Sequence, residues 1–358
     1  MSSYKTLKVL DWPKYRFYSD SHPLHRWKNK LRDHGLKVEI YTDHKDHRLI
    51  NADYLFIHSR YFENGWQNIK TRNSQNEAEL LKFLWQARLS AGKIIWLDAA
   101  DSTGSCDFPI IPLVDAFVKK QIHKDLSRYT QDSDSNLRVW LNGAERHEKQ
   151  SDWACPKDQL HKIKVGWNLG LNDYRYFGYK MSRLSNYLSY KLYPLKFVPV
   201  DAERSLDLAF RGTVHQNFTA VSAQRNAVLQ LLSSVNLKVA SGAPVAKKQY
   251  RNELRSSKIS ISPFGWGEVC YRDFESFISG ALLLKPSMEH LQTYPDVYIP
   301  NQTYVPVSWK MDDLKETLEH AVSNYVSLKA VARNGQEVYK EAVNDGEAFV
   351  GRIKSIIT

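Results

Sequence analysis

Segments with strand-like apolar spacing alternate with segments of helical spacing along the first hundred residues. Leu36 to Tyr41 places every second apolar residue on one side, and Lys93 to Asp98 (KIIWLD) is an apolar run typical of a buried strand. Between them, Glu77 to Ala91 carries apolar residues at helical spacing. This alternation predicts a parallel sheet covered by helices on both faces. Further predicted elements in this half are strands at Lys8 to Asp11 and Tyr54 to His58, and a helix from His22 to His34 closed by Gly35.

The pattern starts again near residue 206, with a predicted strand from Leu206 to Phe210. One hydrophobic core rarely grows beyond about 250–300 residues, so a chain of 358 residues favours two domains. We expect an α/β protein with two αβα domains, residues 1–200 and 201–358, joined by a crossing at Val165 to Val200 that is rich in Gly, Asn and Tyr. Further predicted elements are helices at 220–232, 247–255, 273–279, from 312 and from 331 to the end, and strands at 238–240, 258–262, 281–284 and 304–307.

Positive charge is concentrated in the first half of the chain. The net charge is +11, and residues 1–200 hold 32 Lys and Arg against 22 Asp and Glu, whereas the remainder holds 18 against 17. A basic surface binds nucleic acid, an anionic membrane or a phosphorylated acceptor, or is a solvated face without a partner. Residues 174–193 add seven aromatic and four basic side chains and no acid. That composition suits a membrane interface, a nucleic-acid surface or a packed connector.

The cysteines and the N-terminal residues indicate a cytoplasmic protein. The three cysteines (Cys106, Cys155 and Cys270) are widely spaced and form no CxxC, which argues against a disulfide framework or a zinc site. The first residues lack the apolar run of a signal peptide, and we expect no membrane span. Asp132-Ser-Asp134 has a spacing used for metal-bound nucleotide sugars, but it lies in a polar run with no strand before it. We therefore expect no metal site.

The stretch from Ser257 to Pro286 (SKISISPFGWGEVCYRDFESFISGALLLKP) carries the strongest chemical signal. A buried strand ends there, Gly265 and Gly267 allow a turn with close backbone approach, and a helix begins near Arg272. Free backbone N–H groups and the helix dipole make such a helix start an anion site. Arg272 is unfavourable for the dipole there, and a bound diphosphate would explain it; Glu275 lies one turn on, within reach of a ribose. The alternative is a plain strand–turn–helix crossover with a surface arginine.

This stretch resembles the nucleotide-sugar-binding signature of two-domain, GT-B type glycosyltransferases. The sequence Glu275-Ser-Phe-Ile-Ser-Gly280-Ala-Leu-Leu-Leu fits their pattern of a helix bearing Glu, then Gly, then a strand. The resemblance implies two Rossmann-like domains facing a central cleft, with Glu275 holding the donor ribose. Retaining members carry another Glu eight positions upstream, where this chain has Gly267 with Glu268 out of register. That departure favours an inverting reaction and leaves a retaining one open.

The resemblance is closer to bacterial surface-polysaccharide (lipopolysaccharide or capsule) glycosyltransferases. Those enzymes combine phrases like SPFGWGEVCYRDFE, TYVPVSW (Thr303 to Trp309), DAADSTG (Asp98 to Gly104) and VDAFVKKQ (Val114 to Gln121). All four phrases occur here, so the resemblance covers most of the chain. It implies a nucleotide-sugar donor and a glycan or lipid-linked glycan acceptor.

The predicted site residues follow from these motifs. Asp98 and Asp101 flank the end of a buried strand, where ligands of open α/β sheets bind, so one of them is expected to be the general base; alternatively Asp101 caps a turn. Arg211 is expected to pair with the donor phosphates, or else to belong to a tight strand-to-loop turn. The expected donor-binding residues are Arg211, Gly212, Thr213, Gly265, Gly267, Glu268, Tyr271, Arg272 and Glu275. The expected acceptor-binding residues are Lys119, Lys120 and His123, which otherwise form a solvated face, together with Trp167 and Asn168.

The sequence thus predicts a metal-independent, cofactor-free glycosyltransferase acting in surface-polysaccharide synthesis. It is expected in the cytoplasm, with peripheral contact to the anionic inner face of the cytoplasmic membrane and without a nucleic-acid partner. Two alternatives stay open: a basic nucleic-acid- or membrane-binding protein without catalysis, and a nucleotide-sugar epimerase or hydrolase on the same fold.

Overall fold

The structure is a computed structural model that describes residues 4–11, 20–62, 73–103, 107–130, 154–169, 195–214 and 219–358. Of the features discussed above, the Asp132–Asp134 spacing, the aromatic segment 174–193, Gly104 and Cys106 lie outside the described residues. Within the described residues, no helix combines the length and the apolar character needed to cross a membrane.

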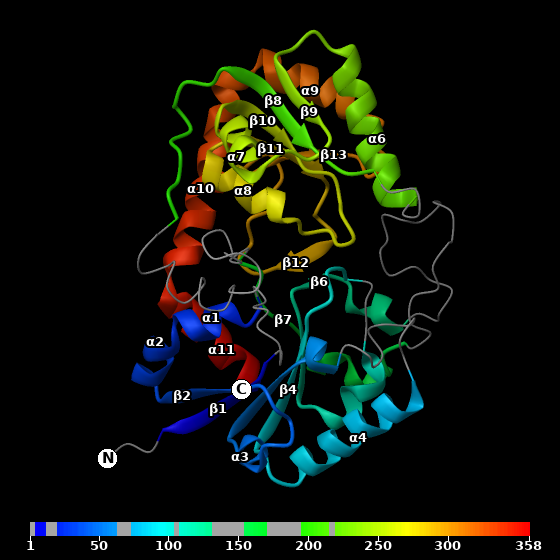
Figure 1. The fold of residues 1–358 in the computed structure, drawn as a ribbon, viewed down its shortest axis with the longest axis vertical. Coiled ribbons are helices and arrows are strands. Elements are labelled where there is room, and N and C mark those ends of the chain that lie inside the picture. The colour runs from blue at the N-terminus through cyan, green and yellow to red at the C-terminus, as the bar shows by residue number, and fades with distance from the viewer. Residues whose placement is uncertain are drawn as a thin grey trace.

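The first half forms a parallel sheet of six strands (Figure 1). Its strands lie in the order β2-β1-β3-β4-β5-β7, so the strand order reverses beside β1. Helices α1 and α2 pack on one face, and α4 packs on the other. The bounds are β1 Lys5–Leu10, β2 Leu36–Tyr41, β3 Tyr54–His58, β4 Lys93–Asp98, β5 Ala116–Lys119, β7 Ile163–Val165, α1 His22–Arg26, α2 Lys28–Asp33, α3 His47–Ile50 and α4 Ser74–Arg88.

The second half forms a parallel sheet of five strands in the order β13-β11-β10-β8-β9, which reverses beside β8. Alternate side chains of its strands enter two layers: Leu208 and Ile259 pack under α6 and α9, whereas Leu283 packs under α8 and α10. The bounds are β8 Leu206–Arg211, β9 Val239–Gly242, β10 Ser257–Ile261, β11 Leu282–Pro286, β13 Val305–Val307, α6 Thr219–Ser234, α7 Lys247–Arg255, α8 Tyr271–Ser279, α9 Leu314–Ser323 and α10 Tyr325–Asn344. The molecule therefore has two Rossmann-like αβα domains, as the sequence predicts.

Two predicted helices are interrupted, each for a local reason. The helix expected from His22 to His34 breaks at Trp27, whose backbone leaves the helical region between α1 and α2. The helix expected from about residue 331 to the end breaks at Asp345, which is extended and whose carboxylate accepts a hydrogen bond from the backbone N–H of Ala348. That contact caps a separate helix, α11 (Gly346–Ile357).

Helix α11 returns from the second sheet to the first (Figure 1). Phe349 packs between Trp27 and Trp167, with ring centroids 4.9 and 5.3 Å away. The Nζ of Lys93 donates to the carbonyl of Ile357 at 2.7 Å, at the end of α11. One buried apolar cluster consequently runs from the first sheet through α11 to α8 and α10.

A short antiparallel ribbon also joins the two halves. β6 (Gln121–His123) from the first half pairs with β12 (Leu291–Thr293) from the second, and Figure 1 shows the pair between the two sheets. Next to it, the backbone N–H of Lys124 donates to the carbonyl of His290 at 3.0 Å. Ribbon and helix together fix the carboxyl ends of the two sheets toward each other.

Candidate active site

The predicted donor motif lies where the strand order of the second sheet reverses. β8 and β10 are neighbours there, and the chain leaves them toward opposite edges of the sheet. In open α/β sheets, ligands bind in the crevice outside the carboxyl ends of the strands at this point. Gly212 and Thr213 follow β8, and residues 262–270, which we call the donor loop, follow β10.

A buried ion pair holds the donor loop in place. Asp273 accepts hydrogen bonds from the Oγ of Ser262 at 2.5 Å, the backbone N–H of Cys270 at 3.0 Å and the hydroxyl of Tyr298 at 2.8 Å. The Nζ of Lys285 lies 3.0 Å from the same carboxylate, and both charged side chains are fully buried. These contacts start α8 at the end of the donor loop, and Gly280 ends the helix in the left-handed conformation (φ +65°).

The arginines at this crevice differ in their partners. Arg211 makes a two-pronged ion pair with Glu253, at 2.9 and 2.8 Å, so its charge is already neutralised. Arg272 lies over the Phe210 ring at 4.7 Å and donates to the carbonyl of Arg211. The structure thus places Arg211 in a protein ion pair rather than as an open fork, and its expected donor contact stays a prediction.

Arg225 joins this group from α6, and sequence reasoning missed it. It donates to the carbonyl of Thr213 at 2.5 Å, and a Cβ placed on Gly265 would lie 3.9 Å from its guanidinium. Burial lowers the pKa of Arg225, and the positive charge of Arg272 lowers it further. Two cations therefore lie close together at the carboxyl ends of β8 and β10. A lone arginine on an amphipathic helix gives no sequence signal of this kind.

The remaining predicted donor residues lie around the turn. Gly212 packs so closely on Phe210 that a Cβ would approach its ring to 2.8 Å, and Thr213 is exposed. Glu275 is half-buried and accepts a hydrogen bond from the hydroxyl of Tyr250 at 2.8 Å; burial raises its pKa. Tyr271 is exposed at the start of α8. Glu268, in contrast, is fully buried with its carboxylate against the first domain.

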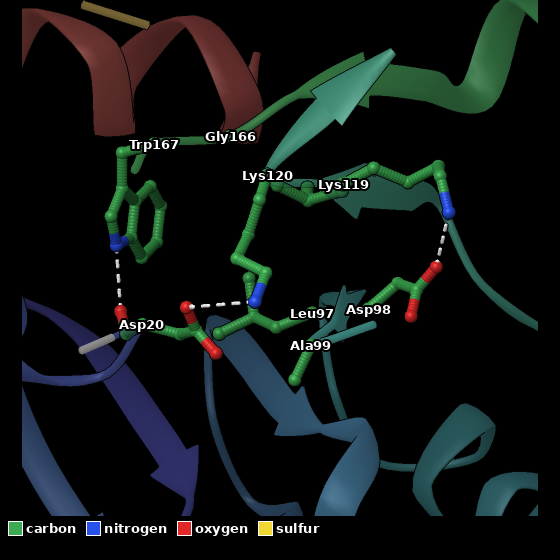
Figure 2. Close-up of a pocket in the computed structure, with 9 residues that line it drawn as sticks. Asp20, Leu97, Asp98, Ala99, Lys119, Lys120, Gly166 and Trp167 are labelled. Atoms are coloured by element: carbon green, nitrogen blue, oxygen red, sulfur yellow. Dashed lines mark hydrogen bonds and ion pairs between the residues drawn. The ribbon is translucent and has the colours of Figure 1, made fainter. Parts of the chain in front are cut away.

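A small pocket lies at the carboxyl ends of the strands of the first sheet (Figure 2). Figure 2 shows the side chain of Lys120 entering it toward Asp20, whereas Lys119 turns to the other side and meets Asp98. The Lys119–Asp98 pair is buried, with Nζ and Oδ2 2.5 Å apart. The lining residues are Asp20, Leu97, Asp98, Ala99, Val118, Lys119, Lys120, Gly166 and Trp167.

The two predicted catalytic carboxylates have different surroundings. Asp98 is buried and paired, whereas the Asp101 side chain is 53% exposed. Asp101 lies 3.0 Å from the Nζ of Lys120 and 3.9 Å from the guanidinium of Arg60. Burial alone would raise the pKa of Asp101, but Lys120 and Arg60 outweigh it and hold the pKa below its usual value. Asp101 is therefore an accessible carboxylate at neutral pH.

Asp20 is a further carboxylate at this site that sequence reasoning did not single out. It lies 3.8 Å from the Nζ of Lys120 and 3.6 Å from the ring of His58. Burial would raise the pKa of Asp20, but Lys120 and His58 together lower it. Asp20 follows β1, at the reversal of strand order in the first sheet. An isolated Asp between predicted elements carries no pattern that would identify it.

The expected acceptor residues separate into two groups. Lys120 and Trp167 line the pocket, and the indole N–H of Trp167 donates to the carbonyl of Asp20 at 2.6 Å. His123 lies in the ribbon, 6.1 Å from the ring of His290, and Asn168 binds the carbonyl of Tyr294 through its backbone N–H at 2.8 Å. His123 and Asn168 are therefore part of the contact between the halves and are not among the residues lining the pocket.

The two sites meet at a direct backbone contact. A Cβ placed on Gly267 of the donor loop would lie 1.5 Å from the carbonyl oxygen of Asp101. The glycine turn therefore lies against the loop that carries Asp101, and the carboxyl ends of the two sheets face each other. This arrangement of two Rossmann-like domains decides the fold.

The chain has the GT-B fold. Its neighbours among solved structures include an alpha-glucosyltransferase in complex with UDP and a 13-mer DNA containing an HMU base, with a TM-score of 0.52, 9% sequence identity and coverage of 99% of this chain and 100% of that one. A complex of alpha-glucosyltransferase with UDP-glucose and DNA containing an abasic site gives a TM-score of 0.50, 8% identity and the same coverage. At such identities the likeness concerns the fold alone. No family model matches the sequence, and no curated protein matches it.

Proposed function

We propose that this GT-B protein is a glycosyltransferase that moves a sugar from a nucleotide-diphosphate sugar to an acceptor held by the first domain. The observation that carries the proposal is one contact, at which a loop next to two arginines packs against a loop that bears a carboxylate. Arg225 and Arg272 lie close together at the carboxyl ends of β8 and β10, and the backbone of Asp101, whose carboxylate is exposed, packs against the glycine turn that follows β10. Cations and helix N–H groups suit a diphosphate, and a carboxylate suits an acceptor hydroxyl.

In this proposal the second domain binds the donor. Arg225, Arg272 and the start of α8 hold the diphosphate, and Glu275 accepts hydrogen bonds from the ribose hydroxyls. Because these groups stabilise the negative charge of the departing diphosphate, the reaction does not require a metal ion or an organic cofactor. Fold neighbours in complex with UDP or UDP-glucose support a nucleotide-sugar donor.

Asp101 is the proposed general base. It takes the proton of the acceptor hydroxyl as that oxygen attacks the anomeric carbon, and the bond to the diphosphate oxygen breaks with its electron pair. Asp98 is less suited, because its carboxylate is buried against Lys119. We favour inversion of the anomeric centre, since the position of the upstream Glu of retaining enzymes is Gly267, where any side chain would collide with the Asp101 carbonyl.

For the acceptor we propose a glycan or lipid-linked glycan of a surface polysaccharide, reached from the cytoplasm at the inner face of the membrane. The excess of basic residues in the first half supports contact with an anionic surface. A specific observation favours a second candidate, because fold neighbours were solved with a 13-mer DNA containing an HMU base or with DNA containing an abasic site. A nucleic-acid acceptor would use the same basic half of the chain.

The first experiment is a thermal-shift screen of nucleoside diphosphates and nucleotide sugars on the parent protein, Arg272→Ala and Glu275→Ala. One nucleotide should raise the melting temperature of the parent and not that of the two folded variants. Donor consumption is then measured with lipid-linked oligosaccharides and with duplex DNA at several salt concentrations. If no nucleotide shifts the parent while all proteins are folded, the transferase proposal is wrong. Transfer of the sugar to DNA would replace the glycan acceptor by a nucleic acid. Salt-dependent DNA binding that is unchanged in Glu275→Ala would also count against the glycan acceptor.

A further inference from the structure

Glu268 is the one acidic residue of the donor loop, and its side chain contacts residues of the first domain. The carboxylate is fully buried. Its Oε1 accepts a hydrogen bond from the hydroxyl of Thr103 at 2.7 Å, and its Oε2 accepts one from the backbone N–H of Thr103 at 3.1 Å. Thr103 belongs to residues 99–103, which we call the base loop because it carries Asp101. Both oxygens of a donor-loop carboxylate are thus bound to the base loop.

Gln121 completes the contact from the interdomain ribbon. Its side-chain N–H group lies 3.3 Å from the Oε2 of Glu268 and 2.7 Å from the carbonyl oxygen of Asp101. That carbonyl is the atom against which Gly267 packs. The backbone of the base loop is therefore held at two points: at the carbonyl of Asp101 by Gln121, and at Thr103 by Glu268.

The Asp101 carboxylate, in contrast, is held from within the first domain. Its side-chain contacts are with Lys120 and Arg60, both from the first half of the chain. These ion pairs orient the carboxylate, but the distance from the carboxylate to the donor loop depends on the backbone of the base loop. That backbone is tied to the donor loop through Glu268.

We propose that Glu268 is a positioning residue of the transferase reaction: it fastens the base loop to the donor loop and so sets Asp101 at reacting distance from the donor. This inference rests on the proposed function, and it replaces the expectation that Glu268 binds the donor. A carboxylate that is buried against Thr103 and Gln121 has its acceptor oxygens occupied by protein donors. A misplacement of a reacting group by about 1 Å costs about a hundredfold in rate. Losing the hydrogen bonds between Glu268 and Thr103, which we call the latch, should therefore lower turnover and leave donor affinity intact.

The test compares Glu268→Gln and Thr103→Val with the parent, and with Glu316→Gln as a matched loss of an exposed carboxylate. Three quantities are measured: the Kd of UDP, kcat and KM for turnover of UDP-glucose, and hydrogen exchange of the backbone amides of residues 99–103. We expect kcat to fall at least tenfold in both latch variants, the Kd of UDP and KM to change less than threefold, and exchange to rise at least tenfold. The double variant should be no worse than either single one, because both substitutions break the same contact. Glu316→Gln should match the parent.

Each opposite result overturns a defined part of the inference. A tenfold weaker Kd of UDP in Glu268→Gln would make Glu268 a donor ligand. Unchanged exchange at residues 99–103 would mean that the base loop does not depend on Glu268, whatever the parent does with UDP-glucose. If exchange rises but the parent neither binds UDP nor turns over UDP-glucose, the latch stands as a structural contact. The proposed role of the latch in sugar transfer then fails, and so does the proposal that UDP-glucose is the donor.

Discussion

At the scale of single residues, the candidate site is organised by which charges are already paired. Arg211 and Asp98, two residues that the sequence brings forward, each make an ion pair of 2.9 Å or less with Glu253 and Lys119. Arg272 and Asp101 are more available for a ligand. Arg272 donates to backbone carbonyls, and Asp101 is paired with Lys120 at 3.0 Å but keeps 53% of its side chain exposed. Charge pairing and exposure together therefore divide residues that a motif treats alike.

The arginines should differ in donor binding. We expect Arg225→Ala and Arg272→Ala each to weaken UDP binding about 10- to 100-fold, because a hydrogen bond to a charged group contributes about 1.5–3 kcal/mol. Arg211→Ala should change UDP affinity less than threefold and instead lower stability, since it leaves Glu253 without its two-pronged partner. Isothermal titration and urea unfolding measure the two effects. Equal losses of affinity in all three variants would contradict this division.

The two aspartates should also separate. Asp101→Asn removes the proposed base and should lower kcat by about 10²–10⁴-fold while UDP still binds. Asp98→Asn removes the negative charge beside the buried Lys119, and breaking a buried pair costs about 3–5 kcal/mol, so this variant should lose stability. Steady-state kinetics and urea unfolding of both proteins test the assignment. It is wrong if Asp98→Asn stays as stable as the parent but is the slower enzyme.

At the scale of elements, α11 is the piece of chain whose position the pattern of apolar residues leaves open. Its apolar face predicts burial, but not against which sheet. The structure packs it on the first sheet, where Lys93 and Lys164 donate to carbonyls of its last turn. The C-terminus thus closes the first domain, although it follows the second in sequence.

Phe349→Ala tests the docking of α11. Removing a buried Phe side chain costs about 3–5 kcal/mol, and this ring fills the space between Trp27 and Trp167. We expect a lower urea midpoint and a change in tryptophan fluorescence, because both neighbours are indoles. Val326→Ala, at a position 83% exposed on α10, is the control and should stay within about 0.5 kcal/mol of the parent. A loss below about 1 kcal/mol in Phe349→Ala would place α11 elsewhere.

At the scale of the whole molecule, the halves are joined by an apolar cluster, a ribbon and the base-loop latch. The ribbon places His123 and His290 6.1 Å apart, and His290 packs edge-on against Trp309 at 4.9 Å. Burial lowers the pKa of His290 to about 4. The imidazole is therefore neutral in the folded protein at a pH where the unfolded chain would begin to protonate it.

This shift should make stability fall in mild acid. Between pH 6.5, the ordinary pKa of His, and about pH 4, the unfolded chain binds a proton at residue 290 that the folded chain does not. Stability therefore decreases as the pH falls through this window, and His290 adds nothing further below it. Urea unfolding between pH 7 and 4 should show a shallower pH dependence in His290→Phe than in the parent. Parallel curves would exclude this contribution.

The sequence by itself determined the local elements and the donor motif. β2, β3, β4 and α7 have the predicted bounds, because apolar spacing and the cap glycines act within a few residues of each other. The strand, glycine turn and helix around Gly265 were readable for the same reason.

Only the tertiary structure decided which of these residues share a site. Arg225 reaches it from α6 and Asp20 from the turn before α1, and neither segment carries a motif of its own. Side chains far apart in sequence meet only when strands are ordered in a sheet. Glu268, an expected donor ligand, contacts Thr103 and Gln121 of the first domain, and no local pattern in the sequence shows that contact. Pairing between distant charges, and the packing of α11 across the two sheets, depend on the folded arrangement and leave no periodic signal in the chain.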